Sequence, residues 1–165
     1  MNLATRDNRI ILGFDPGLAR VGYGAIRMQS SRPLCIEYGC ITTSPEETMS
    51  ERLLRIFTSV GALVDRFKPS IIAIEKLYFA TNSKTAMDVS HARGVILLAL
   101  AQKGGTLYEY TPLQVKQAVT GYGKAEKLQV QKMVSLLLGL SHMPKPDDAA
   151  DALAIALCAS NIMTH

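Results

Sequence analysis

The sequence predicts an α/β domain with a mixed sheet flanked by helices, and three observations lead to this class. Apolar segments of strand length fill much of the first 42 residues, strand-like and helix-like segments then alternate, and the last third is helical. The expected order is βββ-α-β-α-β-α-α-α. With 165 residues the chain can bury one core, so we expect a single domain over residues 1–165, with its core at about 10–162.

Three N-terminal strands are expected at residues 10–14, 21–28 and 34–42. The first, IILGF, is an uninterrupted apolar run, which is typical of a central strand covered on both faces. It ends at Asp-Pro-Gly, a strong turn signal. Short polar breaks between the segments predict an antiparallel meander. Gly22 and Gly24 interrupt the second strand and indicate that another part of the chain approaches closely there.

Helices and strands alternate in the middle of the chain. Apolar residues recur at helical spacing over residues 48–67, and a proline follows the end of that segment. The apolar strand 70–75, SIIAIE, ends at an acid. A second long helix is expected at 85–102, where a Gly-Gly pair terminates it, and a short strand at 107–110 follows.

Three helices are expected to complete the chain. Thr111-Pro112 opens the first of them with proline at the first helical position, and GYGK breaks it. The second is expected at residues 125–138. After the loop SHMPKP, an alanine-rich helix is expected at 147–162. The small side chains of this last helix would allow it to pack close to a sheet.

The charge distribution is more informative than the net charge of +4. Four lysines, Lys116, Lys124, Lys127 and Lys132, stand in one segment against a single acid, Glu126. Such a basic segment is the usual footprint of a phosphate-rich partner. A solvated helix face is the alternative, and charge alone favours that alternative.

Composition excludes several classes of protein. No apolar run approaches the roughly 20 residues needed to cross a bilayer, and the N-terminus has no signal-peptide pattern. We therefore expect a cytoplasmic protein without a membrane partner. Cys35, Cys40 and Cys158 have no metal-like spacing, so we interpret them as packing residues. Neither zinc nor a cysteine nucleophile has support.

Two acids stand at the ends of expected strands. Asp15 follows the first strand and Glu75 ends the fourth. In open α/β sheets, sites form beyond the carboxyl ends of strands, so these acids converge if the two strands are neighbours. For either acid alone there is an ordinary alternative, because strand ends often meet solvent and an acid is common there.

Two further acids lie on the last helix. Asp148 and Asp151 are three residues apart, which places them on one helix face. Carboxylates are also favoured by the dipole at a helix N-terminus, and we expect Asp147 to be the N-cap. Asp151 lies one turn further in, among residues that should be buried. An uncompensated buried acid is costly, and a metal ion would remove that cost.

Four carboxylates together are suited to a hard divalent cation such as Mg²⁺ or Mn²⁺. Two such ions can activate a water molecule and stabilise the leaving oxygen in phosphodiester hydrolysis. A carboxylate that bridges both ions needs a rigid position, and the end of a central strand provides one. That favours Asp15 as the bridging ligand.

The chain resembles the RuvC family of bacterial Holliday-junction resolvases over residues 11–159, in four segments that follow the family's order and spacing. These segments are DPGLARVGYG, AIEKLYFATNSKTAMDVSHARG, YTPLQVKQAVTGYGKAEKLQVQKMV and DDAADALAIA. The resemblance implies an RNase H-like fold of the retroviral-integrase superfamily. It also implies a homodimer that resolves four-way junction DNA by paired symmetric nicks in recombination and repair, in partnership with RuvA and RuvB.

The resemblance also implies the residues of the site. The catalytic and metal-binding acids would be Asp15, Glu75, Asp148 and Asp151. They would hold two Mg²⁺ ions per subunit, for which Mn²⁺ would substitute. Asp147 would be left in the capping role.

DNA contacts follow from the same resemblance. Tyr78 matches the position of an aromatic residue that stacks on an opened base, and the adjacent Phe79 could share this role. Both could instead be packing residues. Lys116 and Lys127 match DNA-contacting lysines, which overturns the solvated-face interpretation, and we add Lys124 of the same segment.

The helix at 85–102 corresponds to the family's dimer helix. Five of its apolar residues would face the partner subunit or the core: Val89, Ala92, Val95, Ile96 and Ala99.

The sequence leaves two alternative functions to consider, an ATPase and a non-catalytic DNA-binding module. An ATPase related to actin and the sugar kinases shares the strand-Asp-Gly start, but the chain is too short for two such halves. A non-catalytic module that binds branched DNA would gain nothing from four clustered negative charges near phosphate.

Overall fold

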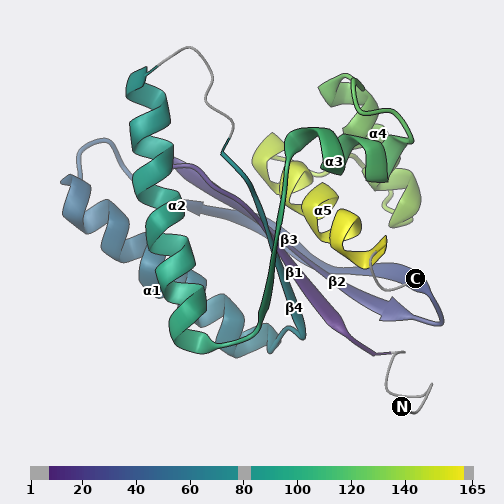
Figure 1. The fold of residues 1–165 in the computed structure, drawn as a ribbon, viewed down its shortest axis with the longest axis horizontal. Coiled ribbons are helices and arrows are strands. Elements are labelled where there is room, and N and C mark those ends of the chain that lie inside the picture. Colours follow the sequence, from purple (N-terminus) through teal and green to yellow (C-terminus); the bar gives the residue numbers. More distant parts are fainter. Residues whose placement is uncertain (1–7, 78–82, 162–165) are drawn as a thin grey trace.

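The computed structural model describes residues 8–77 and 83–161, and its elements follow the predicted order (Figure 1). The strands are β1 (Ile10–Asp15), β2 (Arg20–Gln29), β3 (Arg32–Thr42), β4 (Ile71–Glu75) and β5 (Thr106–Tyr110). The helices are α1 (Met49–Phe67), α2 (Ser83–Lys103), α3 (Pro112–Thr120), α4 (Lys127–Leu137) and α5 (Asp147–Ser160). Every predicted element is present, with boundaries that differ by a few residues.

The five strands form one mixed sheet in the order β3-β2-β1-β4-β5. The first three are antiparallel, which confirms the predicted meander. Strand β4 lies parallel to β1, and β5 lies parallel to β4. The two acid-tipped strands, β1 and β4, are therefore neighbours that point the same way, which meets the condition for their acids to converge.

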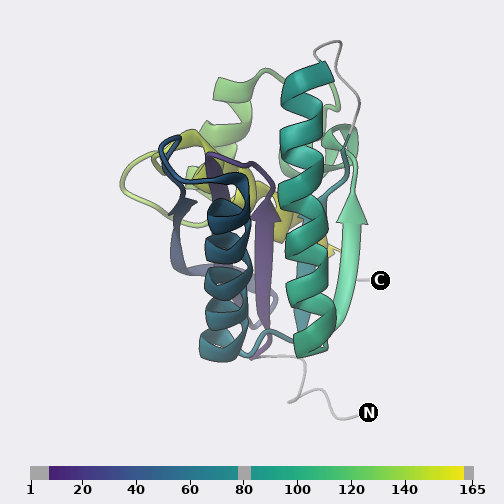
Figure 2. The ribbon, with the colours of Figure 1, turned by 90° about the vertical axis from the view of Figure 1, so that its left-hand side faces the viewer.

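Helices cover both faces of the sheet (Figures 1 and 2). Helices α1 and α2 lie side by side on one face, over a core that includes Leu12, Phe14, Ile72 and Ile74. Helices α3, α4 and α5 cover the other face. Because side chains alternate along a strand, the residues that follow Phe14 and Ile74 point toward the α5 side.

Close packing of α5 on the sheet depends on strand residues without side chains. A Cβ atom added to Gly22 would lie 2.0 Å from the Asp148 carbonyl oxygen, and one added to Gly13 would lie 2.3 Å from that of Ala152. A third contact of this kind joins Gly24 to Leu153. This confirms the predicted close approach at the second strand and identifies the approaching element as α5.

Local signals set most helix starts. Thr48 caps α1 and Thr111 caps α3, each in a reciprocal capping box with the residue three positions later. The prediction for α5 was wrong, because its N-cap is Pro146 and no side chain caps the helix. Asp147 instead occupies the first helical position, where its carboxylate is turned toward Lys127 at 3.4 Å.

The inward face of α2 packs on the core of its own chain. Ala92, Ile96 and Ala99 are buried, and Val95 packs against them. Met87 and Leu98 are more than half exposed on the same helix. None of the helices within the described ranges is both long enough and apolar enough to cross a membrane.

Candidate active site

The carboxyl ends of β1 and β4 place two acids next to each other on the α5 side of the sheet. The last paired residues of these strands are Phe14 and Ile74, and Asp15 and Glu75 each follow by one position. Asp15 also pairs with Gly22 of the adjacent strand β2, and Gly22 lies directly beneath the first turn of α5. The site therefore forms where two parallel strands end under a helix N-terminus.

Helix α5 contributes the other two acids from its first turns. Asp148 and Asp151 lie on its sheet-facing side, and their side chains are about one-third exposed, at 35% and 32%. Buried alanines, from Ala149 to Ala159, surround them along the helix. All four predicted acids thus lie around one end of the sheet.

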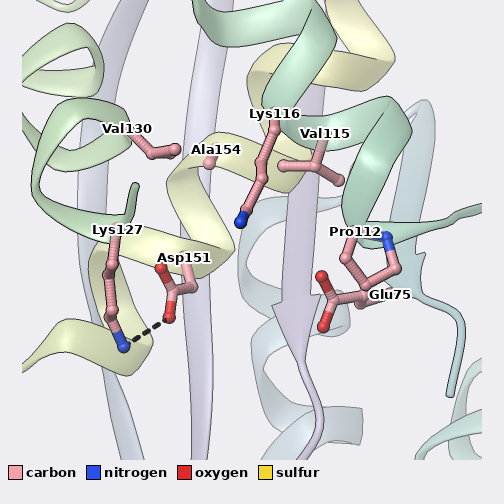
Figure 3. Close-up of a pocket in the computed structure, with 8 residues that line it drawn as sticks. All are labelled: Glu75, Pro112, Val115, Lys116, Lys127, Val130, Asp151 and Ala154. Atoms are coloured by element: carbon pink, nitrogen blue, oxygen red, sulfur yellow. Dashed lines mark ion pairs between the residues drawn. The ribbon is translucent and has the colours of Figure 1, made fainter. Parts of the chain in front are cut away.

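A small cavity separates Asp151 from Glu75 (Figure 3). It holds about 200 Å³ and has an apolar wall made by Val115, Val130 and Ala154. Lys116 points into the space between the two carboxylates, and Lys127 approaches Asp151 from the α4 side. The cavity is therefore lined by two acids and two lysines beside an apolar wall, and one lysine forms an ion pair with one acid.

The titration of these acids reflects burial and mutual repulsion. Burial raises the pKa of Asp15 well above its usual value, and the other three acids raise it further, while Lys127 lowers it. Burial also raises the pKa of Glu75 to about 7, with a contribution from Asp151 against Lys116 and Lys127. The pKa of Asp151 is raised by burial despite its contact with Lys127. Strongly perturbed acids in a cleft mark a candidate functional site.

Basic side chains hold the two acids of α5. The Nζ atom of Lys127 lies 3.0 Å from the Oδ2 atom of Asp151. Burial lowers the pKa of Lys127, but its contacts with Asp151 and Asp147 raise it overall. On the other side, the Arg20 guanidinium lies 3.7 Å from the Asp148 carboxylate.

Within the described residues, no three His, Cys, Asp or Glu side chains are grouped closely enough to hold a metal ion. Each α5 acid instead lies beside a basic side chain, Asp151 beside Lys127 and Asp148 beside Arg20. The oxygen donor set nevertheless fits a hard divalent cation. A cation would offset the mutual repulsion that adds to burial in raising the pKa of Asp15.

The remaining predicted site residues divide into two groups. Lys116 lines the cavity, whereas Lys124 is exposed between α3 and α4 and does not line it. Tyr78 and Phe79 lie outside the described residues.

Sequence reasoning missed Arg20 and Arg93. Arg20 begins β2 and meets Asp148, and Arg93 on α2 donates a hydrogen bond to the Glu75 carbonyl oxygen at 3.2 Å. Neither contact has a local sequence signal, because each joins segments that only the tertiary fold brings together.

The cysteines behave as packing residues. Cys158 is buried, and Cys35 and Cys40 are partly buried. Burial raises the pKa of Cys40 to about 11, with contributions from the nearby charges of Asp148 and Asp15. A raised pKa favours the protonated thiol, whereas the thiolate is the reactive form of cysteine.

Comparison with known proteins identifies the family. The sequence model of the family described as Crossover junction endodeoxyribonuclease RuvC matches residues 11–159. The chain belongs to the RuvC family. RuvC of Alkaliphilus metalliredigens is 53% identical over 149 residues, which cover 90% of this chain and 91% of the relative. RuvC of Rubrobacter xylanophilus is 51% identical over 156 residues, which cover 94% of this chain and 87% of the relative.

Solved structures agree with this assignment. RuvC of T. thermophilus in complex with a Holliday junction substrate superimposes with a TM-score of 0.89 at 36% identity, covering 94% of this chain and 96% of the other. The yeast mitochondrial Holliday junction resolvase is 14% identical with a TM-score of 0.69, over 96% of this chain and 82% of the other, and it shows the fold alone. The predicted RNase H-like fold is confirmed.

Membership of the RuvC family gives the chain its enzyme class. It is a crossover junction endodeoxyribonuclease, a divalent-metal-dependent DNA endonuclease of recombination and repair. The two alternative functions, an actin-like or sugar-kinase-like ATPase and a non-catalytic DNA-binding module, are not favoured.

Proposed function

We propose that this protein resolves Holliday junctions by two symmetric nicks, made by a homodimer that carries one acidic site in each subunit. The observation that supports this proposal is the convergence of Asp15 and Glu75 at adjacent parallel strand ends beneath the acids of α5. A protein that only bound DNA would gain nothing from placing four carboxylates beside phosphate. The whole activity would reside in a single domain with its core at about residues 10–162.

Asp15, Glu75, Asp148 and Asp151 would hold two Mg²⁺ ions per subunit, with Mn²⁺ as a substitute. When bound, the ions would supply a water molecule of lowered pKa and neutralise charge on the leaving oxygen. Asp15 would be a rigidly held ligand, because it ends the central strand and lies within electrostatic reach of the other three acids. Asp151 and Asp148 now contact Lys127 and Arg20, and the same carboxylates would serve as metal ligands.

The basic residues would bind and orient the scissile strand. Lys116 points into the cavity, so its ammonium group can contact a phosphate held between Glu75 and Asp151. Lys127, once released from Asp151, would bind a phosphate oxygen and could stabilise charge in the transition state. Lys124 is exposed and would contact the backbone at the rim. Tyr78 and Phe79 remain candidates for stacking on an unpaired base.

Several wider assignments accompany this proposal. The second subunit would dock on α2, whose exposed residues include Met87 and Leu98. Cleavage would be coupled in the cytoplasm to the RuvA–RuvB branch-migration complex.

The test uses a synthetic four-way junction, labelled on each strand, with the purified protein and Mg²⁺. We expect paired nicks at symmetric positions that leave ligatable 5′-phosphate and 3′-hydroxyl ends. A linear duplex of the same sequence is the control and should stay intact. Equal cleavage of the duplex, or nicks that fall on one strand only, would contradict the proposal.

A further inference from the structure

Arg93 connects α2 to the strand that ends in Glu75. Its Nε atom donates a hydrogen bond to the Glu75 carbonyl oxygen at 3.2 Å. Its guanidinium also forms an ion pair with Glu109 on β5. The Arg93 side chain is only 17% exposed. A single side chain therefore bridges a helix and the carboxyl ends of two strands.

The main chain at Glu75 is held unevenly by the sheet. On the β5 side, Glu75 pairs with Tyr110, and the Lys76 N–H donates to the Tyr110 carbonyl oxygen at 2.7 Å. On the β1 side, the last pair is Phe14 with Ile74, so the β1–β4 ladder stops one residue short of Glu75. Arg93 adds a constraint at the point where this ladder gives none.

Arg93 is itself well anchored. Ala92 and Ile96 on the same helix are fully buried in the core, so the turn that carries Arg93 cannot shift without disturbing the packing. The guanidinium is a rigid planar fork that can bind two acceptors at fixed angles. A lysine at this position would retain the charge but would be a flexible point donor.

Arg93 reaches Glu75 from the α2 side of the sheet, whereas the Glu75 carboxylate lines the cavity beneath α3, α4 and α5. It therefore acts on the peptide group and does not line the cavity itself. We propose that Arg93 is a positioning residue, which fixes the peptide that carries Glu75 and so sets the direction of the Glu75 carboxylate. The inference rests on the proposed function, in which Glu75 holds a divalent cation.

The size of the expected loss on removing Arg93 follows from the usual effect of contacts that orient a metal ligand. Contacts that orient a metal ligand typically change metal affinity or activity by about 10–100-fold. A displacement of about 1 Å in a reacting group can cost about a hundredfold in rate. Loss of Arg93 should therefore appear in the chemical step and in the metal requirement, with little change in junction binding.

The test compares Arg93→Met and Arg93→Lys with the wild-type protein. For Arg93→Met we expect kcat on the four-way junction to fall about 10–100-fold. The Mg²⁺ concentration for half-maximal rate should rise several-fold, and junction affinity without metal should stay within about twofold. Arg93→Lys should restore only part of kcat. Arg66→Met is the matched control, because Arg66 pairs with Glu37 at the opposite edge of the sheet, and it should cleave like wild type.

The outcomes separate this inference from the proposed function. If Glu75→Gln is inactive but Arg93→Met keeps the wild-type kcat and Mg²⁺ requirement, Arg93 has no positioning role. Loss of junction binding in parallel with kcat would also overturn the inference, since it would indicate general damage to the fold. If Glu75→Gln itself cleaves normally, the assignment of Glu75 fails, and the inference fails with it. If Arg93→Met does not fold, Arg93→Lys decides, and an unchanged Mg²⁺ requirement in that variant overturns the inference.

Discussion

The Nζ atom of Lys127 lies 3.0 Å from the Oδ2 atom of Asp151, and this ion pair spans the gap between α4 and α5 beside the cavity. Only part of the pair is shielded, because the Lys127 side chain is 54% exposed. The pair keeps a cation beside a carboxylate that the proposed mechanism assigns to metal. It also places a positive charge where a phosphate would arrive.

Lys127→Ala should therefore reduce cleavage more than binding. We expect the rate to fall about a hundredfold, because a charge near the reacting phosphate is lost. Junction affinity should fall modestly, and the slope of log affinity against log salt should decrease by about one. Lys132→Ala is the control, since Lys132 is an exposed lysine of α4 that does not line the cavity. Cleavage by Lys127→Ala at the level of the Lys132→Ala control would refute the catalytic role of Lys127.

Asp15→Asn should separate binding from cleavage. The substitution keeps the shape of the side chain but removes the carboxylate that the other three acids surround. We expect cleavage to fall at least about a thousandfold, while junction binding measured by gel shift stays near wild type. Asp65→Asn is a suitable control, because Asp65 pairs with Lys103 outside the cavity. Residual cleavage near the wild-type rate would remove Asp15 from the list of metal ligands.

Neutralising Asp15 should also stabilise the metal-free fold. Burial and neighbouring negative charges raise the pKa of Asp15, so its ionised form opposes folding at neutral pH. We expect Asp15→Asn to raise the metal-free Tm at pH 7.5 by about 2–5 °C. The same substitution at pH 4, where the acid is protonated in the fold, should change Tm much less. A fall in Tm at pH 7.5 would contradict this account.

The pH dependence of stability follows from Glu75. Its pKa is about 7 in the folded protein against a usual value of 4.5, so between these pH values the folded state binds more protons than the unfolded state. The contribution of Glu75 to the free energy of unfolding therefore falls as pH rises from about 4.5 to 7 and is level above that. The raised pKa of Asp15 likewise makes the free energy of unfolding fall as pH rises. In metal-free melting curves, Tm of Glu75→Gln should therefore fall less than Tm of the wild-type protein between pH 4.5 and 7.

Divalent metal should restore the stability that the metal-free protein loses as pH rises. Carboxylates bind metal in their ionised form, so added Mg²⁺ should raise Tm clearly at pH 7.5 and very little at pH 5. Thermal melts with and without Mg²⁺ at the two pH values measure the difference. An equal Mg²⁺ effect at both pH values would mean that the cation binds away from these acids.

Gly22→Ala tests whether close packing of α5 positions its acids. The new Cβ atom would lie 2.0 Å from the Asp148 carbonyl oxygen, so α5 must move away from β2. We expect a loss of about 2–3 kcal/mol in the free energy of unfolding and a large loss of cleavage. Gly94→Ala is the control, since nothing lies within 4 Å of its added Cβ atom in α2. This helix substitution should stabilise the protein by about 0.5–1 kcal/mol.

Much of the fold was predictable because its signals are local. The apolar run before Asp15, the helical spacing over residues 48–67 and the turn at Asp-Pro-Gly depend on neighbouring residues only. The N-cap of α5 was the exception. Asp147 has the residue type of a cap, but Pro146 takes that place, and the Asp147 carboxylate meets Lys127 on another helix. The Asp147 side chain therefore makes a tertiary contact in place of a capping hydrogen bond.

The sequence by itself determined the order of elements, the four acids and the basic segment, and through its motifs it indicated the RuvC family. Only the tertiary structure decided that β1 and β4 are parallel neighbours and that Gly22 admits α5 against the sheet. It also decided which cation meets which acid, because Lys127, Arg20 and Arg93 reach partners far away in the chain. Charge pairing depends on distance in space, and only the packed sheet and helices set that distance.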